Sequence, residues 1–574
     1  MKKILIGILL CGLLFAGGVV GILYLTFSEQ LTIEPNSVLQ IEFTGELTEH
    51  KATPFDLLFS EEPPNSLHGV LTSIRRAATD PAIAGIILNV ISPQIGLAQV
   101  QEIEAAMKEF RETRKWSLSF LETAGSQSTG NGAYALAITA DEVILSPPGA
   151  VNLIGLKAEV PFFGQLFKRL SLVTHIEKRK EFKNAPNSFT HDKFTAPHRE
   201  SLKVLLDGMQ LQLNRHIAAR RDVNLDTAKA WVQNGPHSSK AAKEQGIVDI
   251  IAYYDHMLSE AEKRTGRPDS LVSLNHYLGT AIPKIGTTTI GVIVAAGEIH
   301  RGKSDASPLS PNTSVGSVTV AEAFRAARKD GVAGILFRVN SPGGSYVASD
   351  LIRREVELCR DAGIPVVVTM GNVAGSGGYF IAMEADYIVA SPATITGSIG
   401  VYGGGVATRA FLKRHFGVTF DSYQTSNNAN LFGWLDAPTG SNKKQLTKAI
   451  DDIYNDFVGK AAKARNKSLA EAENFAKGRI WSGEDALRLG LVDELGGYFT
   501  AQEHLIQKKL NITDNSSIDY RLYPVPDGPF KALRKTIASS VSVGSHLSNW
   551  VSTTTRTLVT SNEVQLRSVD FRLE

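Results

Sequence analysis

The stretch Val373–Gly400, VAGSGGYFIAMEADYIVASPATITGSIG, is the part of this chain around which the rest is interpreted. It places Ser376 between glycines, after an apolar run and before the helical pattern Tyr379–Ala385. Glycines beside a serine permit backbone angles that other residues avoid, and they let a second main chain approach closely. A strand that ends in such a turn exposes the hydroxyl and directs backbone N–H groups at a carbonyl oxygen. The stretch therefore predicts a nucleophilic serine, and the alternative is a serine that only caps a helix.

The segments around this stretch occur twice in the chain, in the same order and at nearly constant separation. Strand-like runs such as Gly85–Val90 and Ser117–Phe120 alternate with helical patterns such as Leu67–Ala78, and this predicts crossover units and a largely parallel sheet. The fold class is therefore α/β with a duplicated domain. The corresponding segments are Val38–Leu47 and Ile290–Ile299, Gly85–Pro93 and Gly334–Pro342, Gly130–Pro147 and Gly375–Pro392, and Gln245–Asp249 and Leu489–Asp493.

The two copies differ at the positions that bear on chemistry. The second copy alone keeps the serine and the close-approach glycines, so the first is catalytically incomplete there. The first copy has a lysine that the second lacks. A serine from one half and a lysine from the other would form one site from two degenerate copies. The differing positions are Ser376 against Asn131, Gly343–Gly344 against Gln94–Ile95, and Asn428 against Lys183.

Bulk composition excludes several classes of function. A chain of 574 residues is expected to form two or more domains. Its formal net charge of +2 gives no electrostatic case for nucleic acid as a partner. Cys11 and Cys359 lie in unrelated patterns, the histidines lack zinc spacing, and Gly400–Gly405 lacks the dinucleotide-binding pattern. No cofactor and no metal are predicted.

The apolar run Ile4–Phe27 contains no charged residue and is long enough to cross a bilayer as a helix. Lys2 and Lys3 precede it, so the positive-inside rule keeps the amino terminus in the cytoplasm and places the rest across the membrane. An uncleaved N-terminal transmembrane anchor is predicted. The alternative is a cleaved signal peptide, whose apolar core is usually shorter.

Taken together, the motifs resemble signal peptide peptidase A of the long, duplicated type, also called protease IV. The resemblance extends from the predicted anchor to about residue 510. The motifs that carry it are Asn340–Gly344, Gly375–Tyr379, Thr396–Gly400, Gly478–Gly483 and Gly490–Asp493. It implies a Ser–Lys dyad serine protease built from tandem Clp-protease/crotonase-like domains, a βαβ spiral. It also implies a single-pass homotetramer in the bacterial inner membrane that degrades signal peptides and other apolar peptides on the periplasmic side.

The resemblance also implies roles for particular residues. Ser376 would be the nucleophile, Lys183 the general base and Ser398 the residue that orients the lysine. The N–H groups of Gly343 or Gly344 and of Gly377 would form the oxyanion hole. A lysine can act as a base only if burial, without a carboxylate partner, lowers its pKa. Lys178 and Lys180 are close enough in sequence to be alternatives to Lys183, and Glu181 would have to point away from it.

A Ser–His–Asp triad would use His175 or His415, neither of which belongs to a motif. A crotonase-like enzyme acting on acyl thioesters and a silent membrane scaffold are the competing functions. The predicted domains are the anchor at 1–27, the first repeat at 28–283, the second repeat at 284–510, and an extension at 511–574 that serves as a possible assembly segment.

Overall fold

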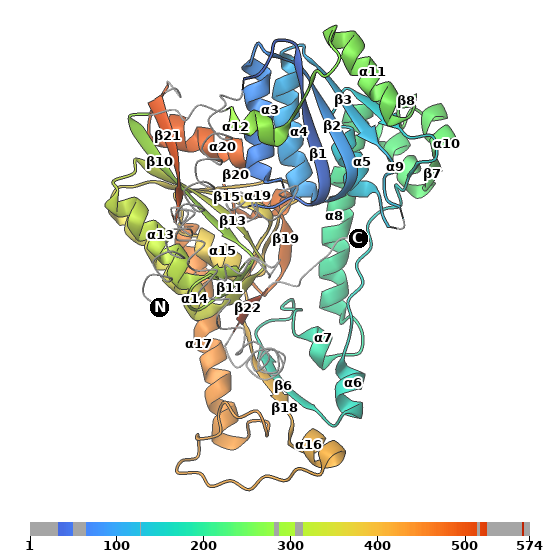
Figure 1. Ribbon diagram of the computed structural model, residues 1–574. Coiled ribbons are helices and arrows are strands. Elements are labelled where there is room, and N and C mark those ends of the chain that lie inside the picture. Colours follow the sequence, from blue (N-terminus) through green and yellow to red (C-terminus); the bar gives the residue numbers. More distant parts are fainter. Residues whose placement is uncertain are drawn as a thin grey trace, which may run out of the picture.

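The computed structural model describes residues 32–49, 65–126, 128–280, 286–304, 314–513, 517–524 and 565–567. The predicted anchor Ile4–Phe27 lies outside these residues. Among the residues described, no helix is both long enough and apolar enough to span a membrane. The chain forms two α/β bodies that lie side by side, with an arm extending below them (Figure 1).

The first body is built on a six-stranded sheet in which every neighbouring pair is parallel. Its central strands are apolar and buried, as expected for a parallel sheet covered on both faces. The strands in spatial order are β8 (Ile250–Ile251), β4 (Glu142–Leu145), β3 (Trp116–Leu121), β2 (Ile83–Gln94), β1 (Ser37–Glu46) and β9 (Leu271–Ser273).

The second body repeats this order with its own strands. The equivalent series is β20 (Glu494–Leu495), β16 (Tyr387–Ala390), β15 (Val366–Gly375), β13 (Gly334–Ser341), β10 (Thr288–Ala296) and β21 (Ile518–Tyr523). Two further strands, β17 (Ile395–Gly397) and β19 (Ile480–Ser482), extend the sheet beyond the end of β15. The matching strand order confirms the predicted duplication of an α/β domain. β21 belongs to this sheet although its residues lie in the predicted extension.

Helices cover the sheets and continue into the arm (Figure 1). In the first body, Ser66 caps α3 by accepting a hydrogen bond from the Gly69 amide. The helices of the first repeat are α3 (Leu67–Thr79), α4 (Leu97–Glu112), α5 (Asn131–Ala137), α6 (Gly164–Arg169), α7 (Asn187–Thr190), α8 (Ala196–Arg221), α9 (Leu225–Gln233), α10 (Ser239–Glu244), α11 (Tyr254–Thr265) and α12 (Leu274–Gly279). Those of the second are α13 (Ser317–Lys329), α14 (Tyr346–Asp361), α15 (Gly377–Ala382), α16 (Arg409–Phe416), α17 (Gly440–Ala464), α18 (Leu469–Ala472), α19 (Gly483–Leu489), α20 (Tyr498–Glu503) and the π-helix η1 (His504–Lys509).

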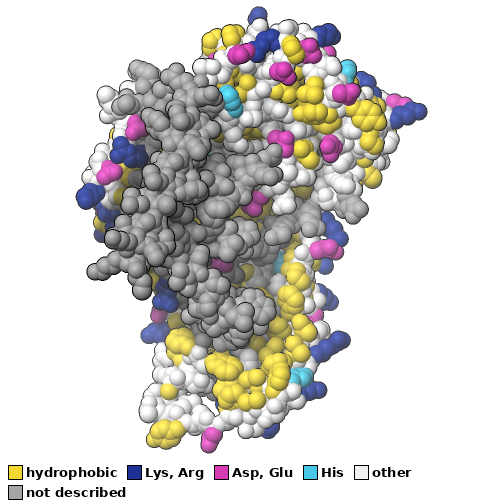
Figure 2. Space-filling model, in the orientation of Figure 1, with side chains coloured by type: hydrophobic (Ala, Val, Ile, Leu, Met, Phe, Trp, Pro, Cys, Tyr) yellow, Lys and Arg dark blue, Asp and Glu magenta, His cyan; other side chains and the backbone are white. Residues whose placement is uncertain are grey.

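A third sheet joins the two repeats. Within it, β18 of the second repeat pairs antiparallel with β6 of the first along their whole lengths. This ladder continues into the arm, residues 163–190 and 402–439, where Figure 2 shows apolar side chains gathered on the visible face. The sheet order is β12 (Ser314–Gly316), β11 (Glu298–His300), β14 (Gly343–Ser345), β22 (Gln565–Arg567), β18 (Tyr402–Ala407) and β6 (Val173–Lys178); β5 (Ala150–Val151) and β7 (His237–Ser238) form a separate pair.

The two bodies share a core and a buried ion cluster. One apolar cluster combines side chains of the first sheet with those of α20 and η1 from the second repeat. Beside it, Arg338 of β13 donates to Glu102 of α4 at 2.8 Å and to Glu49 at 2.9 Å, all three side chains being almost fully buried. Burial raises the pKa of Glu102, and Arg338 opposes that rise. Because a buried charge without its partner is costly, this cluster holds the repeats in one relative position.

Candidate active site

Ser376 occupies a sharp turn between β15, which ends at Gly375, and α15, which begins at Gly377. Its backbone has φ +56° and ψ −113°, a conformation that costs free energy for a residue with a side chain. The turn is held by a 2.8 Å hydrogen bond from the Ser376 amide to the Gly397 carbonyl of β17. The hydroxyl is therefore placed by the surrounding backbone, as expected when strain is maintained at a functional position.

Lys183 enters this turn from the other repeat. It follows β6, whose pairing with β18 brings the chain of the first repeat alongside the segment just after Ser398. Lys183 Nζ lies 2.7 Å from Ser376 Oγ, and it lies 3.1 Å from both the carbonyl oxygen and the hydroxyl of Ser398. The structure thus brings together the three side chains that the sequence analysis assigned to one site. It joins Ser376 to a lysine, whereas His415 is exposed on α16.

Two glycines allow the lysine to be buried so tightly. Gly478 has φ +78°, and a Cβ on it would lie 2.6–2.7 Å from the Lys183 backbone and Cβ. A Cβ on Gly400 would lie 3.3 Å from Lys183 Cδ and 2.9 Å from Gly478 Cα. Gly400 and Gly478 both lie in motifs noted in the sequence, but their contact with Lys183 could not be foreseen from them.

Burial alone lowers the pKa of Lys183 well below its usual value. The side chain is 1 % exposed, and Ser376 and Ser398 are also buried. Glu181, the nearest acid in sequence, is exposed to solvent. Lys180 is directed outward, where it pairs with Glu473 at 3.3 Å. Desolvation disfavours the ammonium form when no carboxylate compensates for it, so the site favours a neutral amine.

Lys178, the other sequence alternative, takes a supporting position. Its Nζ donates to the Lys183 carbonyl at 3.1 Å and to Asn187 Oδ1 at 2.9 Å. Asn187 is fully buried and contacts His198, whose pKa is lowered to about 4 by burial and by nearby Lys178. This network holds the backbone of the lysine-bearing turn. Sequence reasoning missed it, because only the fold brings α7 and α8 against β6.

The glycines assigned to the oxyanion hole lie next to Ser376. A Cβ on Gly377 would come within 3.0 Å of Gly343 Cα and of the Gly344 nitrogen, so β14 directly adjoins the start of α15. Gly343 and Gly344 have φ +101° and +154°. The Gly343 amide already donates to Ser341 Oγ at 3.2 Å. The Gly377 amide lies in the first turn of α15, where N–H groups have no partner within the helix.

Comparison with known proteins shows the family. The chain matches Peptidase family S49 over residues 123–267 and 359–512, which include Lys183 and Ser376. The chain belongs to peptidase family S49. It is a serine protease. It is 32% identical to Protease 4 of Salmonella typhi over 76% of this chain and 70% of the relative. It is 27% identical to the chloroplastic serine protease SPPA of Arabidopsis thaliana over 89% of this chain and 74% of the relative.

Two solved structures align with parts of this S49 peptidase. A ClpP1 mutant from Listeria monocytogenes is 16% identical, with a TM-score of 0.24, over 36% of this chain and 90% of that one. A mutant of the 1510-N membrane-bound stomatin-specific protease is 17% identical, with a TM-score of 0.25, over 41% of this chain and 97% of that one. Membership of a serine peptidase family sets aside both competing functions, the acyl-thioester enzyme and the silent scaffold.

The first repeat of the S49 peptidase has no hydroxyl where the second has Ser376. Asn131 occupies the equivalent turn, and its amide donates to the Gly155 carbonyl at 2.6 Å. Gly155 is the counterpart of Gly400 in the duplicated sequence. The hydrogen bond therefore joins the turn at Asn131 to the counterpart of Gly400, whereas Gly400 itself lies against the Lys183 side chain.

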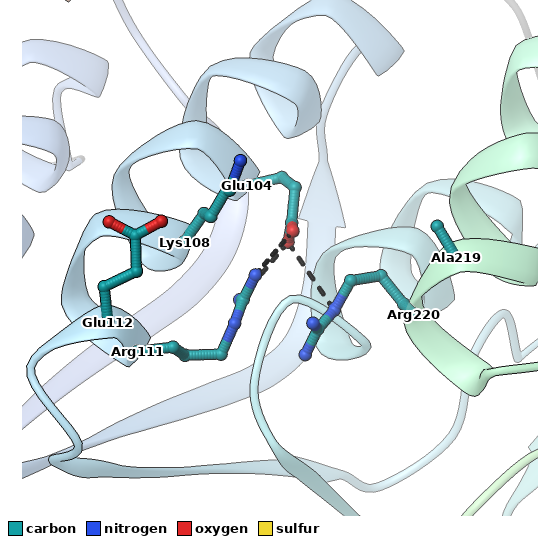
Figure 3. Close-up of a pocket in the computed structure, with 6 residues that line it drawn as sticks. All are labelled: Glu104, Lys108, Arg111, Glu112, Ala219 and Arg220. Atoms are coloured by element: carbon teal, nitrogen blue, oxygen red, sulfur yellow. Dashed lines mark hydrogen bonds and ion pairs between the residues drawn. The ribbon is translucent and has the colours of Figure 1, made fainter.

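A surface pocket of the S49 peptidase lies between α4 and α8, and its arginines serve a structural role there (Figure 3). Glu104 accepts a 2.6 Å hydrogen bond from Arg111 and lies 3.8 Å from Arg220. Arg220 also donates to the Ile138 carbonyl at 2.8 Å, and Arg111 to the Thr139 carbonyl. The arginines therefore satisfy carbonyls at the carboxyl end of α5. The pocket is lined by Glu104, Lys108, Arg111, Glu112, Ala219 and Arg220.

The lowered pKa of Lys183 predicts a pH-dependent contribution to stability. Between the lowered pKa and the ordinary value of 10.5, the unfolded state binds a proton that the folded state does not, so the free energy of unfolding rises with pH. We expect the stability of the wild type to rise with pH relative to Lys183→Met, the difference levelling off near pH 10.5. Thermal unfolding of both proteins from about pH 6 to about pH 10.5 measures this. Equal pH slopes would contradict it, and Lys180→Met serves as the exposed-lysine control.

Proposed function

We propose that this serine protease is a membrane-anchored endopeptidase that uses Ser376 as nucleophile and Lys183 as general base. The observation that carries the proposal is the 2.7 Å contact between Ser376 Oγ and a buried amine that has no carboxylate partner among the described residues. A serine hydroxyl is a weak nucleophile at neutral pH and needs an adjacent base. A lysine serves as that base only when its surroundings favour the neutral amine.

Ser398 is proposed to orient the amine. A neutral amine has two N–H donors and one lone pair. If the donors are used by the Ser398 carbonyl and hydroxyl, the lone pair is directed at the third neighbour, the Ser376 hydroxyl. Ser398 is itself held at φ +53° by a 2.7 Å hydrogen bond from its amide to the Arg479 carbonyl. The proposed role needs this rigidity, because the lone pair has to stay aligned with the hydroxyl.

The reaction follows from these positions. Ser376 Oγ attacks the scissile carbonyl carbon while its proton passes to Lys183 Nζ. The resulting oxyanion is stabilised by the N–H groups of Gly377 and of Gly343 or Gly344. The Gly343 amide would exchange its bond to Ser341 Oγ for one to the oxyanion. The carbon–nitrogen bond then breaks as the lysine ammonium protonates the leaving amine. Water, losing its proton to Lys183, hydrolyses the ester, and the proton returns to Ser376.

The substrates are proposed to be cleaved signal peptides and other apolar peptides at the membrane. A relative named putative signal peptide peptidase SppA, from Enterococcus faecium, is 34% identical over 33% of this chain and 55% of its own length. The uncharged run Ile4–Phe27 supports a membrane anchor. The arm carries exposed apolar side chains, including Val173 and Phe416, as a protein that works beside a membrane or on apolar peptides would.

Assembly, location and detailed fold are part of the same proposal. The enzyme would be a single-pass homotetramer in the bacterial inner membrane, with its catalytic region on the periplasmic side. Lys2 and Lys3 before the apolar run support that orientation. The two parallel sheets of matching strand order, and a third sheet with strands from both repeats, support the Clp-protease/crotonase-like spiral as the domain fold.

The test of the proposal is covalent labelling of Ser376. A fluorophosphonate probe is expected to add once per chain, with the adduct located at Ser376 by peptide mass spectrometry. Its rate should rise with pH along one limb whose midpoint lies well below 10.5, since the amine has to be neutral. Lys183→Met should slow labelling, while Lys180→Met should not. A labelled serine elsewhere, or a flat profile from about pH 6 to about pH 10, would refute the assignment.

A further inference from the structure

Arg479 follows Gly478, the glycine that lies against the Lys183 backbone, and its side chain is held between two aromatic rings. The guanidinium carbon of Arg479 lies 4.7 Å from the centre of the Phe182 ring and 4.8 Å from the centre of the Trp481 ring. A planar guanidinium is attracted to aromatic faces, and the attraction is stronger where water is excluded. Phe182, Arg479 and Trp481 therefore form an aromatic sandwich next to the lysine.

The main chain of the same segment contacts both turns that meet at the Lys183 amine. The Arg479 carbonyl accepts the 2.7 Å hydrogen bond from the Ser398 amide, and the Lys477 carbonyl accepts a 3.1 Å hydrogen bond from the Phe182 amide. Ser398 belongs to the second repeat, whereas Phe182 and Lys183 belong to the first. Arg479 thus contacts the Ser398 turn through its backbone and the lysine-bearing turn through its side chain.

Two members of the sandwich are fixed from outside it. Arg479 donates a 2.7 Å hydrogen bond to Glu200 of α8, and Trp481 donates through its ring nitrogen to the Phe475 carbonyl at 3.0 Å. The Nε of Arg479 is buried and has no hydrogen-bond partner among the residues that the structure describes. An unpaired buried donor costs free energy, so the guanidinium keeps this position despite that cost. Phe182 is the third member, and it is held against the other two.

We propose that Arg479 is a positioning residue that keeps Lys183 aligned with Ser398 and Ser376 by holding Phe182 in the sandwich. This inference rests on the proposed function, in which Lys183 is the general base. Without the planar guanidinium, the turn that carries Phe182 loosens, and the amine spends less time aligned with the serine hydroxyl. Because Arg479 acts through Phe182 and Ser398, its loss lowers kcat and leaves KM unchanged.

The loosened turn also changes the titration of Lys183. Water that enters the turn stabilises the ammonium form, and removal of the Arg479 cation favours the same form. Both effects raise the pKa of Lys183 towards its ordinary value, from which burial lowers it in the intact protein. The charged residues on the segments around Lys183 are Lys178, Lys180, Glu181, Glu473, Lys477 and Arg479.

The test compares full-length Arg479→Met with the wild type. Methionine fills a similar length but has no planar cation. We expect kcat for an internally quenched apolar peptide to fall on the order of tenfold to a hundredfold with KM unchanged, the size of effect that a displacement of about an ångström produces. The midpoint of the pH limb for fluorophosphonate labelling of Ser376 should move to higher pH. Arg215→Met is the matched control, because Arg215 pairs with Glu484 at 3.2 Å on the surface, and it should keep the wild-type kcat and midpoint.

Two further variants separate the sandwich from charge and from general loss of structure. Arg479→Lys keeps the positive charge but lacks the planar face, so a similar fall in kcat is expected. Phe182→Leu should also lower kcat, and combining it with Arg479→Met should give less than the product of the two separate falls, because both changes remove one contact. Thermal unfolding identifies the variants that are folded. Wild-type kcat in folded Arg479→Met or Arg479→Lys, or independent effects in the double variant, would overturn the proposal.

The labelling profiles also distinguish failure of this inference from failure of the proposed function. A flat pH profile in the wild type would refute Lys183 as the base, and the role of Arg479 would fall with it. A sloping wild-type profile whose midpoint is unmoved in folded Arg479→Met would refute the role of Arg479 alone. A rise in KM without a fall in kcat would also overturn that role, because it would mean that Arg479 binds substrate instead of positioning the base.

Discussion

Replacing Lys183 with methionine should lower kcat for an apolar peptide by roughly 10²–10⁴-fold, the usual contribution of a positioned base. Methionine is similar in length and apolar, so it suits the tight space beside Gly400 and Gly478, and the fold should persist. It cannot accept a proton, and the Ser376 hydroxyl would lose its neighbour at 2.7 Å. Steady-state hydrolysis of an internally quenched apolar peptide measures the effect.

The control for this variant is Lys180→Met. Lys180 is three residues away, but it is exposed and pairs with Glu473 on the surface, so its loss should change kcat by less than about twofold. Thermal unfolding of both variants shows whether either has lost its structure. Wild-type kcat in a folded Lys183→Met protein, or a large loss in Lys180→Met, would show that the base has been assigned to the wrong lysine.

Replacing Ser376 with alanine should remove activity almost entirely, with a fall in kcat on the order of 10⁶-fold. The reason is that Ser376 carries the hydroxyl that lies 2.7 Å from Lys183 Nζ at the turn between β15 and α15. The backbone there is held by the hydrogen bond from the Ser376 N–H to the Gly397 carbonyl. Alanine keeps that backbone bond and removes only the hydroxyl. The residual rate is measured with enriched protein over long incubations, because trace contaminating proteases would otherwise hide the loss.

Ser391→Ala is the matched control for Ser376→Ala. Ser391 is 1 % exposed, and its hydroxyl donates to the Gly496 carbonyl, away from Lys183. Its loss is expected to lower stability by about 1 kcal/mol and to leave kcat essentially unchanged. Hydrolysis by Ser376→Ala within about tenfold of the wild type would mean that the nucleophile lies elsewhere.

Local sequence patterns correctly predicted several of the strands and helices of the fold. The apolar runs predicted strands at Gly85–Val90 and Ser117–Phe120, and the structure extends these to β2 and β3. The helical pattern at Leu67–Ala78 became α3 with one further residue. The third sheet was not predicted, because its strands come from both repeats and from the predicted extension. Pairing between segments so distant leaves no periodic signal in any one of them.

For the candidate site, local sequence and tertiary structure supplied different parts. Ser376, its flanking glycines and their absence from the first repeat can be read from the chain, because conformational freedom at glycine is a local property. Three lysines lie within six residues, and local sequence alone could not separate them as candidates for the general base. The structure separates them by environment: Lys183 is buried against Ser376, Lys178 supports the Lys183 carbonyl, and Lys180 faces solvent.

The sequence by itself determined that the chain is a duplicated α/β protein whose two copies differ in a serine, a glycine pair and a lysine. Only the tertiary structure decided that Lys183 and Ser376, which are 193 positions apart, lie within 2.7 Å. The physical reason is that both the contact with Ser376 and the lowered pKa of Lys183 arise from tertiary packing, which removes the amine from water. That packing depends on β6 pairing with β18 and on Gly400 and Gly478 closing over the side chain.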